Sequence, residues 1–406
     1  MTLTDAGSRL SARYWRFRWA TGFATVGDGV FAAAVPLLAV AVTHDPRLVS
    51  IVSAATYVPW LLLSLPIGAL VDRYDRVALL WRAQIVQAAV AGVVAVLAAL
   101  GQAGVPALAI TAFGLGTCAV VVGNAAQALL PDLVAKPLLH RANGHQQAIN
   151  TIGLQFAGPP IGSLLFAVAA ALPYGAAAGS FALAAALLAT LPRGGPRHRP
   201  PMGKAIADGL RWLAGHRLLR TLAILLGVNN FCGQLANATL VLLATQTLAL
   251  SPQVYGLLLA AAGIGSLLGA LVNARLVERM GALPALLAAL VTNVAVFAGI
   301  GLSPNAFVLG ALLAVNGFVT TLWNIVTVGL RQESVPSELL GRVNSVYRML
   351  GWGLMPLGAL AGGLVAHALG LRAPYLVSAG LRGLALLAAA PVLIRAVAAA
   401  RRPEQR

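Results

Sequence analysis

The stretch GALVDRYDR, residues 68–76, places four charged side chains between two long apolar runs. The letters GALV return at residues 269–272, where the charged stretch NARLVER follows. A charged hairpin between apolar runs, present twice, predicts that the chain crosses a membrane repeatedly and contains an internal repeat.

The composition is that of a polytopic membrane protein. Of the 406 residues, 59% are hydrophobic and only 10% are charged, and the mean hydropathy is +0.85. A soluble domain carries roughly 25% charged residues. Apolar runs of about 20 residues, each long enough to cross the hydrocarbon core as a helix, recur along the chain. They predict an all-α fold with twelve transmembrane helices, near residues 19–42, 48–71, 78–100, 105–128, 147–169, 173–192, 219–245, 253–274, 283–302, 306–330, 345–368 and 374–395.

The basic residues gather on one side of the predicted membrane. When the loops are numbered alternately, all but three of the 28 Lys and Arg residues fall on that side, and the exceptions are Arg47, Arg372 and Arg382. The positive-inside rule then places both termini in the cytoplasm of a multi-pass protein of the cell (plasma or inner) membrane. The net charge of +17 therefore reflects membrane topology, and no nucleic-acid partner is expected.

An internal repeat relates the two halves of the chain. Gly269 lies 201 residues after Gly68, and the same offset aligns LLHRAN (138–143) with LLGRVN (339–344) and Asp28 with Asn229. Six spans in each half predict two parallel six-helix repeats. We expect bundles at residues 1–192 and 219–406, joined by a cytoplasmic linker at 193–218. The linker contains an interfacial helix, with a soluble cap over the pore as the alternative.

GALVDRYDR resembles the signature between the second and third spans of the major facilitator superfamily, G-x-x-x-D-R-x-x-R. Its residues here are Gly68, Asp72, Arg73 and Arg76. The resemblance implies the superfamily's fold and a hairpin that latches the two halves together in the outward-facing state, and we expect Arg73 and Arg76 to anchor it in the cytoplasm. The alternative is a charge cluster that only sets topology. The second copy departs from the signature, because Asn273 replaces the acid.

Two further stretches indicate a branch of the superfamily. GLQFAGPPIGS (153–163) resembles the antiporter motif G-P-x-x-G-G through Gly158, Pro159 and Gly162, although Ser163 replaces the last glycine. We expect these glycines to pack closely against a span of the opposite half. QESVPSELLGRVNSVYR (332–348) and GDGVFAAAVPLL in the first span resemble the enterobactin exporters and macrolide efflux pumps. That branch implies proton-driven drug export.

Asp28 is the only one of the eleven acidic residues that lies deep in a predicted span. An ionised carboxylate there costs at least ~2.5 kcal/mol on insertion scales, so we expect it to face a wet cavity and to couple transport to protons. Thr25 extends the polar face of the same helix. The alternative is a structural carboxylate paired with a neighbouring helix, and the most obvious buried partner is Arg382.

Polar side chains in other spans form the predicted substrate cavity. Amides in the seventh span fall on one helical face, which either lines the cavity or holds helices together. The full set of cavity candidates is Thr25, Asn229, Asn230, Gln234, Asn237, Gln155, Asn124, Trp323, Asn324 and Tyr347. The histidines and cysteines have no metal-binding spacing, so neither a metal nor any cofactor beyond the proton gradient is expected.

These features predict a monomeric secondary transporter in contact with membrane lipid, which exports a hydrophobic or amphipathic small molecule by proton-coupled alternating access. Uptake or facilitated diffusion of a small nutrient is the alternative. A polytopic membrane enzyme is disfavoured because the chain has no HExxH motif, no Ser/His constellation and no pair of intramembrane acids. No catalytic residue is therefore assigned.

Overall fold

The computed structural model describes residues 11–135, 138–192 and 202–400, and these ranges contain helices and no strand. Eleven helices within them are long and apolar enough to cross a membrane. The remaining predicted span, the second along the chain, is not among the eleven because its helix is interrupted. All twelve predicted spans are therefore present as helix.

The first half begins with α1 (Ala12–Val42) and α2 (Pro46–Leu62). It continues with α3 (Ser64–Arg73), α4 (Arg76–Ala99), α5 (Val105–Leu133), α6 (Leu139–Asn150), the π-helix η2 (Thr151–Ala157), α7 (Gly158–Val168) and α8 (Leu172–Ala189). The elements α6, η2 and α7 together form the fifth span.

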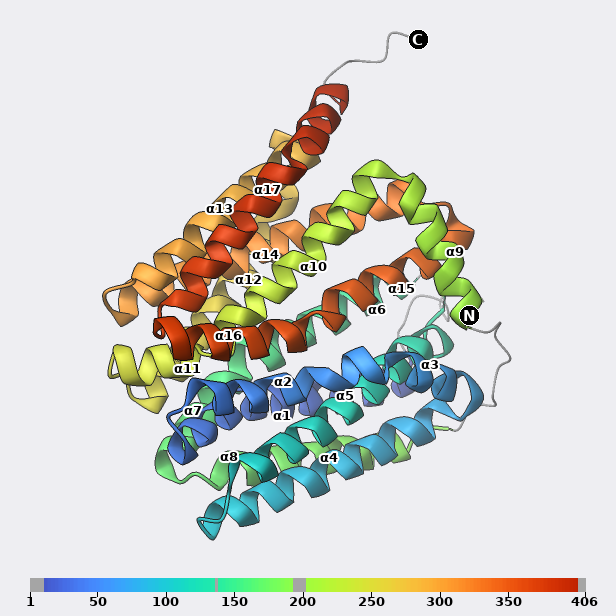
Figure 1. Cartoon of the computed structure of the whole chain (residues 1–406). Helices are drawn as coiled ribbons and strands as arrows, with labels where there is room; N and C mark the ends of the chain where they lie inside the picture. The colour runs from blue at the N-terminus through green and yellow to red at the C-terminus, as the bar shows by residue number, and fades with distance from the viewer. Residues whose placement is uncertain (1–10, 136–137, 193–201, 401–406) are drawn as a thin grey trace.

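The second half follows α9 (Met202–Gly215), which lies in the predicted linker. Its elements are α10 (Arg217–Asn237), α11 (Leu240–Leu242), the π-helix η3 (Leu243–Thr247), α12 (Pro252–Met280), α13 (Ala282–Leu302), α14 (Ala306–Ser334), α15 (Ser337–Gly353), α16 (Met355–Leu369) and α17 (Ala373–Ala400). Figure 1 shows the first six spans, coloured blue to green, on one side and the last six, coloured yellow-green to red, on the other.

The second span breaks at Leu63, between α2 and α3. Pro66 lies three residues beyond the break and has no N–H to donate to the carbonyl of Leu62, so the α-helical hydrogen-bond ladder cannot run through it. The predicted span 48–71 therefore consists of two shorter helices.

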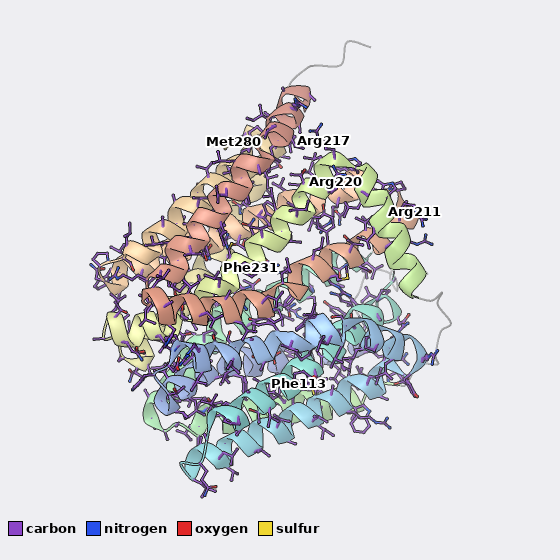
Figure 2. All side chains as sticks on the ribbon, viewed as in Figure 1. Phe113, Arg211, Arg217, Arg220, Phe231 and Met280 are labelled. Carbon is purple, nitrogen blue, oxygen red and sulfur yellow. The ribbon has the colours of Figure 1, made fainter. Side chains whose placement is uncertain are left out.

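Several helices extend further at their basic ends than the apolar runs predicted. The first span starts at Ala12 instead of residue 19, and the eleventh starts at Ser337 instead of residue 345. An apolar run reports only the part of a helix in hydrocarbon, whereas the helix itself continues into the polar region with charged side chains on it. Figure 2 shows Arg211, Arg217 and Arg220 at this end of α9 and α10.

Two pairs of helix starts keep the repeat offset found in the sequence. α5 starts at Val105 and α14 at Ala306, and α8 starts at Leu172 and α17 at Ala373. Both pairs are separated by the same 201 residues that separate the two GALV stretches. Equivalent positions in the two halves can therefore be compared directly in these helices.

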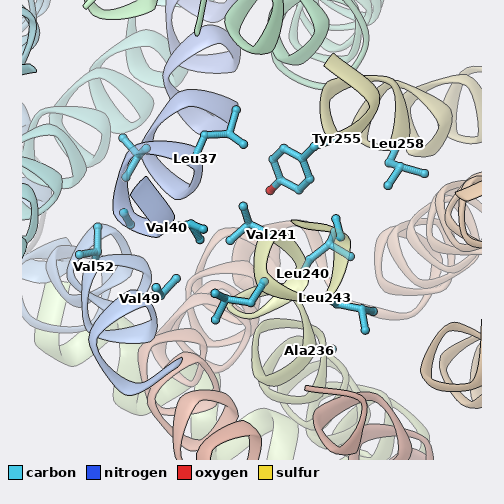
Figure 3. Close-up of a cluster of buried hydrophobic side chains, with 14 of the residues drawn as sticks. Leu37, Val40, Val49, Val52, Ala236, Leu240, Val241, Leu243, Tyr255 and Leu258 are labelled. Carbon is cyan, nitrogen blue, oxygen red and sulfur yellow. The ribbon is translucent and has the colours of Figure 1, made fainter. Parts of the chain in front are cut away.

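The buried apolar residues form different cores at the two ends of the helices. At the basic end, Phe17, Leu80 and Leu130 belong to a core made only of first-half residues. Leu219, Leu286 and Val346 belong to another core, made of α9 and second-half residues. At the opposite end both halves contribute to one shared core, which contains Leu37, Val40, Val49, Val52, Ala236, Leu240, Val241, Leu243, Tyr255 and Leu258 (Figure 3). The halves thus share one apolar core at one end and have separate apolar cores at the other.

Two close helix contacts reinforce the shared end. A Cβ at Gly363 of α16 would lie 2.6 Å from the Cβ of Ser50 in α2. A Cβ at Gly256 of α12 would likewise lie 2.6 Å from the Cβ of Ser163 in α7. In each contact a glycine of the second half lets a serine-bearing helix of the first half approach. We call these two contacts the seams.

The linker helix α9 packs on the basic ends of other helices and contacts α15, α10 and α3. A Cβ at Gly209 would lie 2.7 Å from the carbonyl oxygen of Arg342 in α15, so this side of α9 is tightly packed. Residues 193–201 of the predicted linker lie outside the described ranges.

A cysteine pair across one seam should form a disulfide. We propose Ser50→Cys with Gly363→Cys, in a chain whose free Cys118 and Cys232 are replaced by serine. A small shift of α16 brings the two Cβ atoms into the ~3.5–4.5 Å range of a disulfide. After a protease site placed within residues 193–201 is cut, the halves should stay together on a non-reducing denaturing gel.

The control pair is Tyr74→Cys with Arg275→Cys, two exposed positions related by the repeat at the basic ends. This pair should let the halves separate. Cross-linking of the control pair alone would contradict the placement of the shared core.

Candidate functional site

A cavity of about 880 Å³ lies mainly within the second half and reaches the first half. Most of its lining comes from α10, α13, α14 and α15, and the first half contributes Gln127 of α5 and Gln155 of η2. It extends to Gln332 and Gly341, at the basic ends of α14 and α15. The shared apolar core lies at the other end of α10, α13 and α14.

Most of the predicted cavity residues line this space. They are Gln155, Asn229, Asn230, Gln234, Asn237, Trp323, Asn324 and Tyr347. Thr25 and Asn124 do not belong to its lining. The Thr25 hydroxyl donates to the carbonyl of Gly22, and its side chain fills the space beside Gly153.

Asn229 and Asn230 of α10 have both of the roles expected for its amides. The Asn230 side-chain N–H donates to the carbonyl of Gly351 at 2.9 Å and so joins α10 to α15. The Asn229 side-chain oxygen accepts from the Arg382 guanidinium at 3.2 Å, which joins α10 to α17. Both residues also line the cavity, so this face of α10 both holds helices and presents polar atoms to the space.

Tyr347 contributes chiefly to helix packing. Its hydroxyl donates to the carbonyl of Leu219 at 2.5 Å, and the Arg331 guanidinium carbon lies 4.3 Å from its ring centre. The side chain is buried, so only a small part of it borders the cavity.

Asp28 lies midway along α1 and is half-buried. Within the part of the chain that the structure describes, its carboxylate has neither a hydrogen-bond nor an ion-pair partner. The alternative that pairs it with Arg382 is wrong, because Arg382 bonds instead to Asn229, the residue at the repeat position of Asp28. The carboxylate also lies outside the lining of the cavity described above.

The helix around Asp28 is held by close glycine contacts. A Cβ at Gly158 of α7 would lie 2.5 Å from the Cα of Gly29, and a Cβ at Gly162 would collide with the carbonyl of Val30. The expectation that these two glycines face the opposite half is therefore wrong, because they pack against α1 of their own half. Pro159 and Ser163 of the same motif do meet the opposite half, at Gly256.

The charged hairpin between α3 and α4 is partly buried. Arg76 is 8% exposed, and its guanidinium binds the Asp132 carboxylate at 2.6 Å and the carbonyl of Ala128 at 3.0 Å. Arg73 is exposed, whereas Arg76 fixes the hairpin to α5. Gly68 is buried, and the Asp72 side chain lies outside the described part of the structure.

Two residues of the site were not identified from the sequence. Asn293 and Asn316 line the cavity, and the Asn293 side-chain N–H donates to the Asn316 side-chain oxygen at 3.1 Å. Their signal was present, because each is an isolated amide in an apolar span, in VTNVAV and AVNGF.

Two contacts connect the halves beside the cavity. Arg348 of α15 donates to Gln127 at 2.9 Å and to Asn124 at 3.0 Å, both in α5. The rings of Trp60 and Trp352 stack with centroids 4.5 Å apart. Asn124, a predicted cavity residue, therefore serves in a contact between the halves.

Comparison with known proteins agrees with this architecture. A family described as "Transmembrane secretion effector" matches residues 6–405. The multidrug efflux pump Tap of Mycobacterium tuberculosis is 31% identical over 379 residues, which cover 89% of this chain and 88% of that protein. The Tap pump of Mycolicibacterium fortuitum is 29% identical over 381 residues, covering 87% and 89%.

Solved structures of transporters share the fold. A bacterial homologue of the iron transporter ferroportin in an inward-facing state superposes with a TM-score of 0.74 at 17% identity, covering 96% of this chain and 99% of that one. The nucleoside transporter NupG gives a TM-score of 0.68 at 14% identity, covering 93% and 98%. The chain is therefore a multi-pass membrane transporter and not an enzyme, and it belongs to the transmembrane secretion effector family of the major facilitator superfamily.

Proposed function

We propose that this chain exports an amphipathic small molecule across the cell membrane by alternating access, driven by the proton gradient. The observation that carries the proposal is the pairing of a shared apolar core at one end with separate cores and an extended cavity at the basic end. If the basic end is cytoplasmic, this is the conformation that loads substrate from the cytoplasm. The names of the efflux pumps that the chain resembles support the same direction.

Alternating access requires two units that can rock against each other. Residues 1–192 and 219–406 are the proposed units, because each has a core of its own at the basic end. Opening the opposite end must separate the seams at Ser50 and Gly363 and at Ser163 and Gly256. Small residues suit such a contact, since little side-chain rearrangement is needed when it opens and closes. The working unit is a monomer with both termini in the cytoplasm.

Asp28 is the proposed proton-coupling residue. It is half-buried in α1 and lacks a partner among the described residues, so its charge can change without breaking an ion pair. The tight contacts of Gly27 with Phe181 and of Gly29 with Gly158 hold the backbone on both sides of it. Such a carboxylate takes and releases a proton as the two faces open in turn.

The test of the function is transport into inverted membrane vesicles. With a proton gradient, vesicles that contain the protein should accumulate an amphipathic drug, and collapse of the gradient by an ionophore should abolish the accumulation. Accumulation that survives the ionophore would contradict proton coupling, and uptake only into right-side-out vesicles would contradict export.

Asp28→Asn should abolish accumulation of the drug against its gradient, because a neutral amide cannot carry a proton. Slow exchange down a concentration gradient should remain, since the cavity is otherwise unchanged. Both are measured with purified protein in liposomes, and Glu278→Gln, an exposed carboxylate on α12, is the matched control. Gradient-driven accumulation by Asp28→Asn would remove Asp28 from the mechanism.

Asp72→Asn should slow transport roughly five-fold, which corresponds to a barrier about 1 kcal/mol higher, and should leave drug affinity largely unchanged. The reason is the proposed role of the hairpin as a latch, which favours one conformation without touching substrate. Turnover in liposomes and drug binding in detergent are measured together, with Glu333→Gln as the control. Weaker binding with unchanged turnover of the bound fraction would make the hairpin a folding or topology element.

A further inference from the structure

Arg382 lies in α17 and lines the cavity, although only 7% of its surface is exposed. One terminal nitrogen of its guanidinium donates to the side-chain oxygens of Asn229 and Asn293, and the other donates to the Asn229 carbonyl at 2.8 Å. The guanidinium carbon lies 3.9 Å from the ring centre of Phe297. A cation is therefore fixed at the wall of the cavity by neutral groups.

No negative charge compensates this cation within the described part of the chain. Its hydrogen-bonding partners are amides and a carbonyl, and the thiol of Cys232 is also within reach. The guanidinium Nε–H is buried and has no hydrogen-bond partner. A buried charge without a counter-charge costs several kcal/mol, and an orphaned donor adds to that cost. The positive charge of the guanidinium is therefore not neutralised by any of the described residues around it.

The bundle itself does not require this charge. At the repeat offset of 201 residues, Arg382 corresponds to Phe181, Asn293 to Gly92 and Asn316 to Leu115. The first half thus builds the equivalent helix contacts with apolar residues. The charge and its amides are a feature of the second half alone.

We infer that Arg382 and its amide shell form a subsite for the anionic group of an amphipathic ligand, a carboxylate, sulfonate or phosphate. The inference rests on the proposed function, because it assumes that this cavity holds the substrate. The uncompensated guanidinium charge at the cavity wall attracts the anion, and a hydrogen bond from a charged donor is stronger than one between neutral groups. The Asn316 amide adds polar atoms, and Phe297 and Trp323 supply aromatic surface for the apolar body of the ligand.

Two probes with the same ring system test the subsite. Anilinonaphthalene sulfonate carries the anion, and N-phenylnaphthylamine has the same rings without it. Binding of each to the purified full chain in detergent is measured by titration calorimetry, with protein-free micelles subtracted. The wild-type protein should bind the sulfonate about ten-fold more tightly than the neutral probe, as expected for a charge-assisted hydrogen bond.

Three variants separate the charge from the packing. Arg382→Gln should weaken sulfonate binding about ten-fold and leave the neutral probe unchanged, because it removes the charge and keeps hydrogen-bonding capacity. Asn293→Asp should have the same effect with almost no change of shape, because its carboxylate pairs with Arg382 internally. Arg395→Gln, an exposed arginine on the same helix, is the control and should leave both probes unchanged.

Equal affinity of the wild-type protein for the two probes would overturn the inference. An equal loss of affinity for both probes in Asn293→Asp would also overturn it, because it would show a purely structural role for the cluster. Binding in detergent needs neither a proton gradient nor turnover. A protein that selects the sulfonate but does not transport would therefore keep the subsite and refute only the proposed function.

Discussion

The structure depends on one apolar core that both halves share at the end away from the basic loops. Lipid provides no hydrophobic driving force for helix association, so close van der Waals packing, helped by small residues, must hold this end together. The serine and glycine seams between α2 and α16 and between α7 and α12 supply those contacts. Because the halves keep separate cores at the basic end, the cavity can extend to that end without a loss of packing inside either half.

The two halves of the repeat differ in charge at two facing positions within the membrane helices. Asp28 and Asn229 occupy equivalent positions, and so do Phe181 and Arg382. In the first half, Phe181 packs against Gly27, and the acid has no partner among the described residues, whereas in the second half Arg382 bonds to Asn229. At these two pairs of positions, the first half therefore carries the acid Asp28 and the second half carries the base Arg382. This division separates the proposed proton site from the proposed anion subsite.

The sequence predicted the features that follow from local composition. All twelve spans and the repeat offset are present in the structure, because apolar runs of membrane length leave few alternatives to a helix. The partners of the charged residues could not be predicted. Arg76 bonds to Asp132 in α5, and Arg382 bonds to Asn229 and Asn293 on two other helices. These contacts join helices far apart in the sequence, and one amino-acid sequence by itself contains no signal for such pairs. For the same reason the partner of the glycines in the fifth span was predicted wrongly, because their pattern indicates close packing but not the helix against which they pack.

The break at Leu63 has a consequence for how tightly the membrane stays sealed. It divides the second span into α2, which holds the seam to α16, and α3, which carries the charged hairpin. A continuous rod would transmit every tilt of the hairpin to the seam and would tend to open both faces together. A jointed rod absorbs the tilt, so one face can close before the other opens. Under the proposed alternating-access mechanism, a carrier built in this way would pass through an occluded intermediate and would not become a leak that dissipates the ion gradient of the cell.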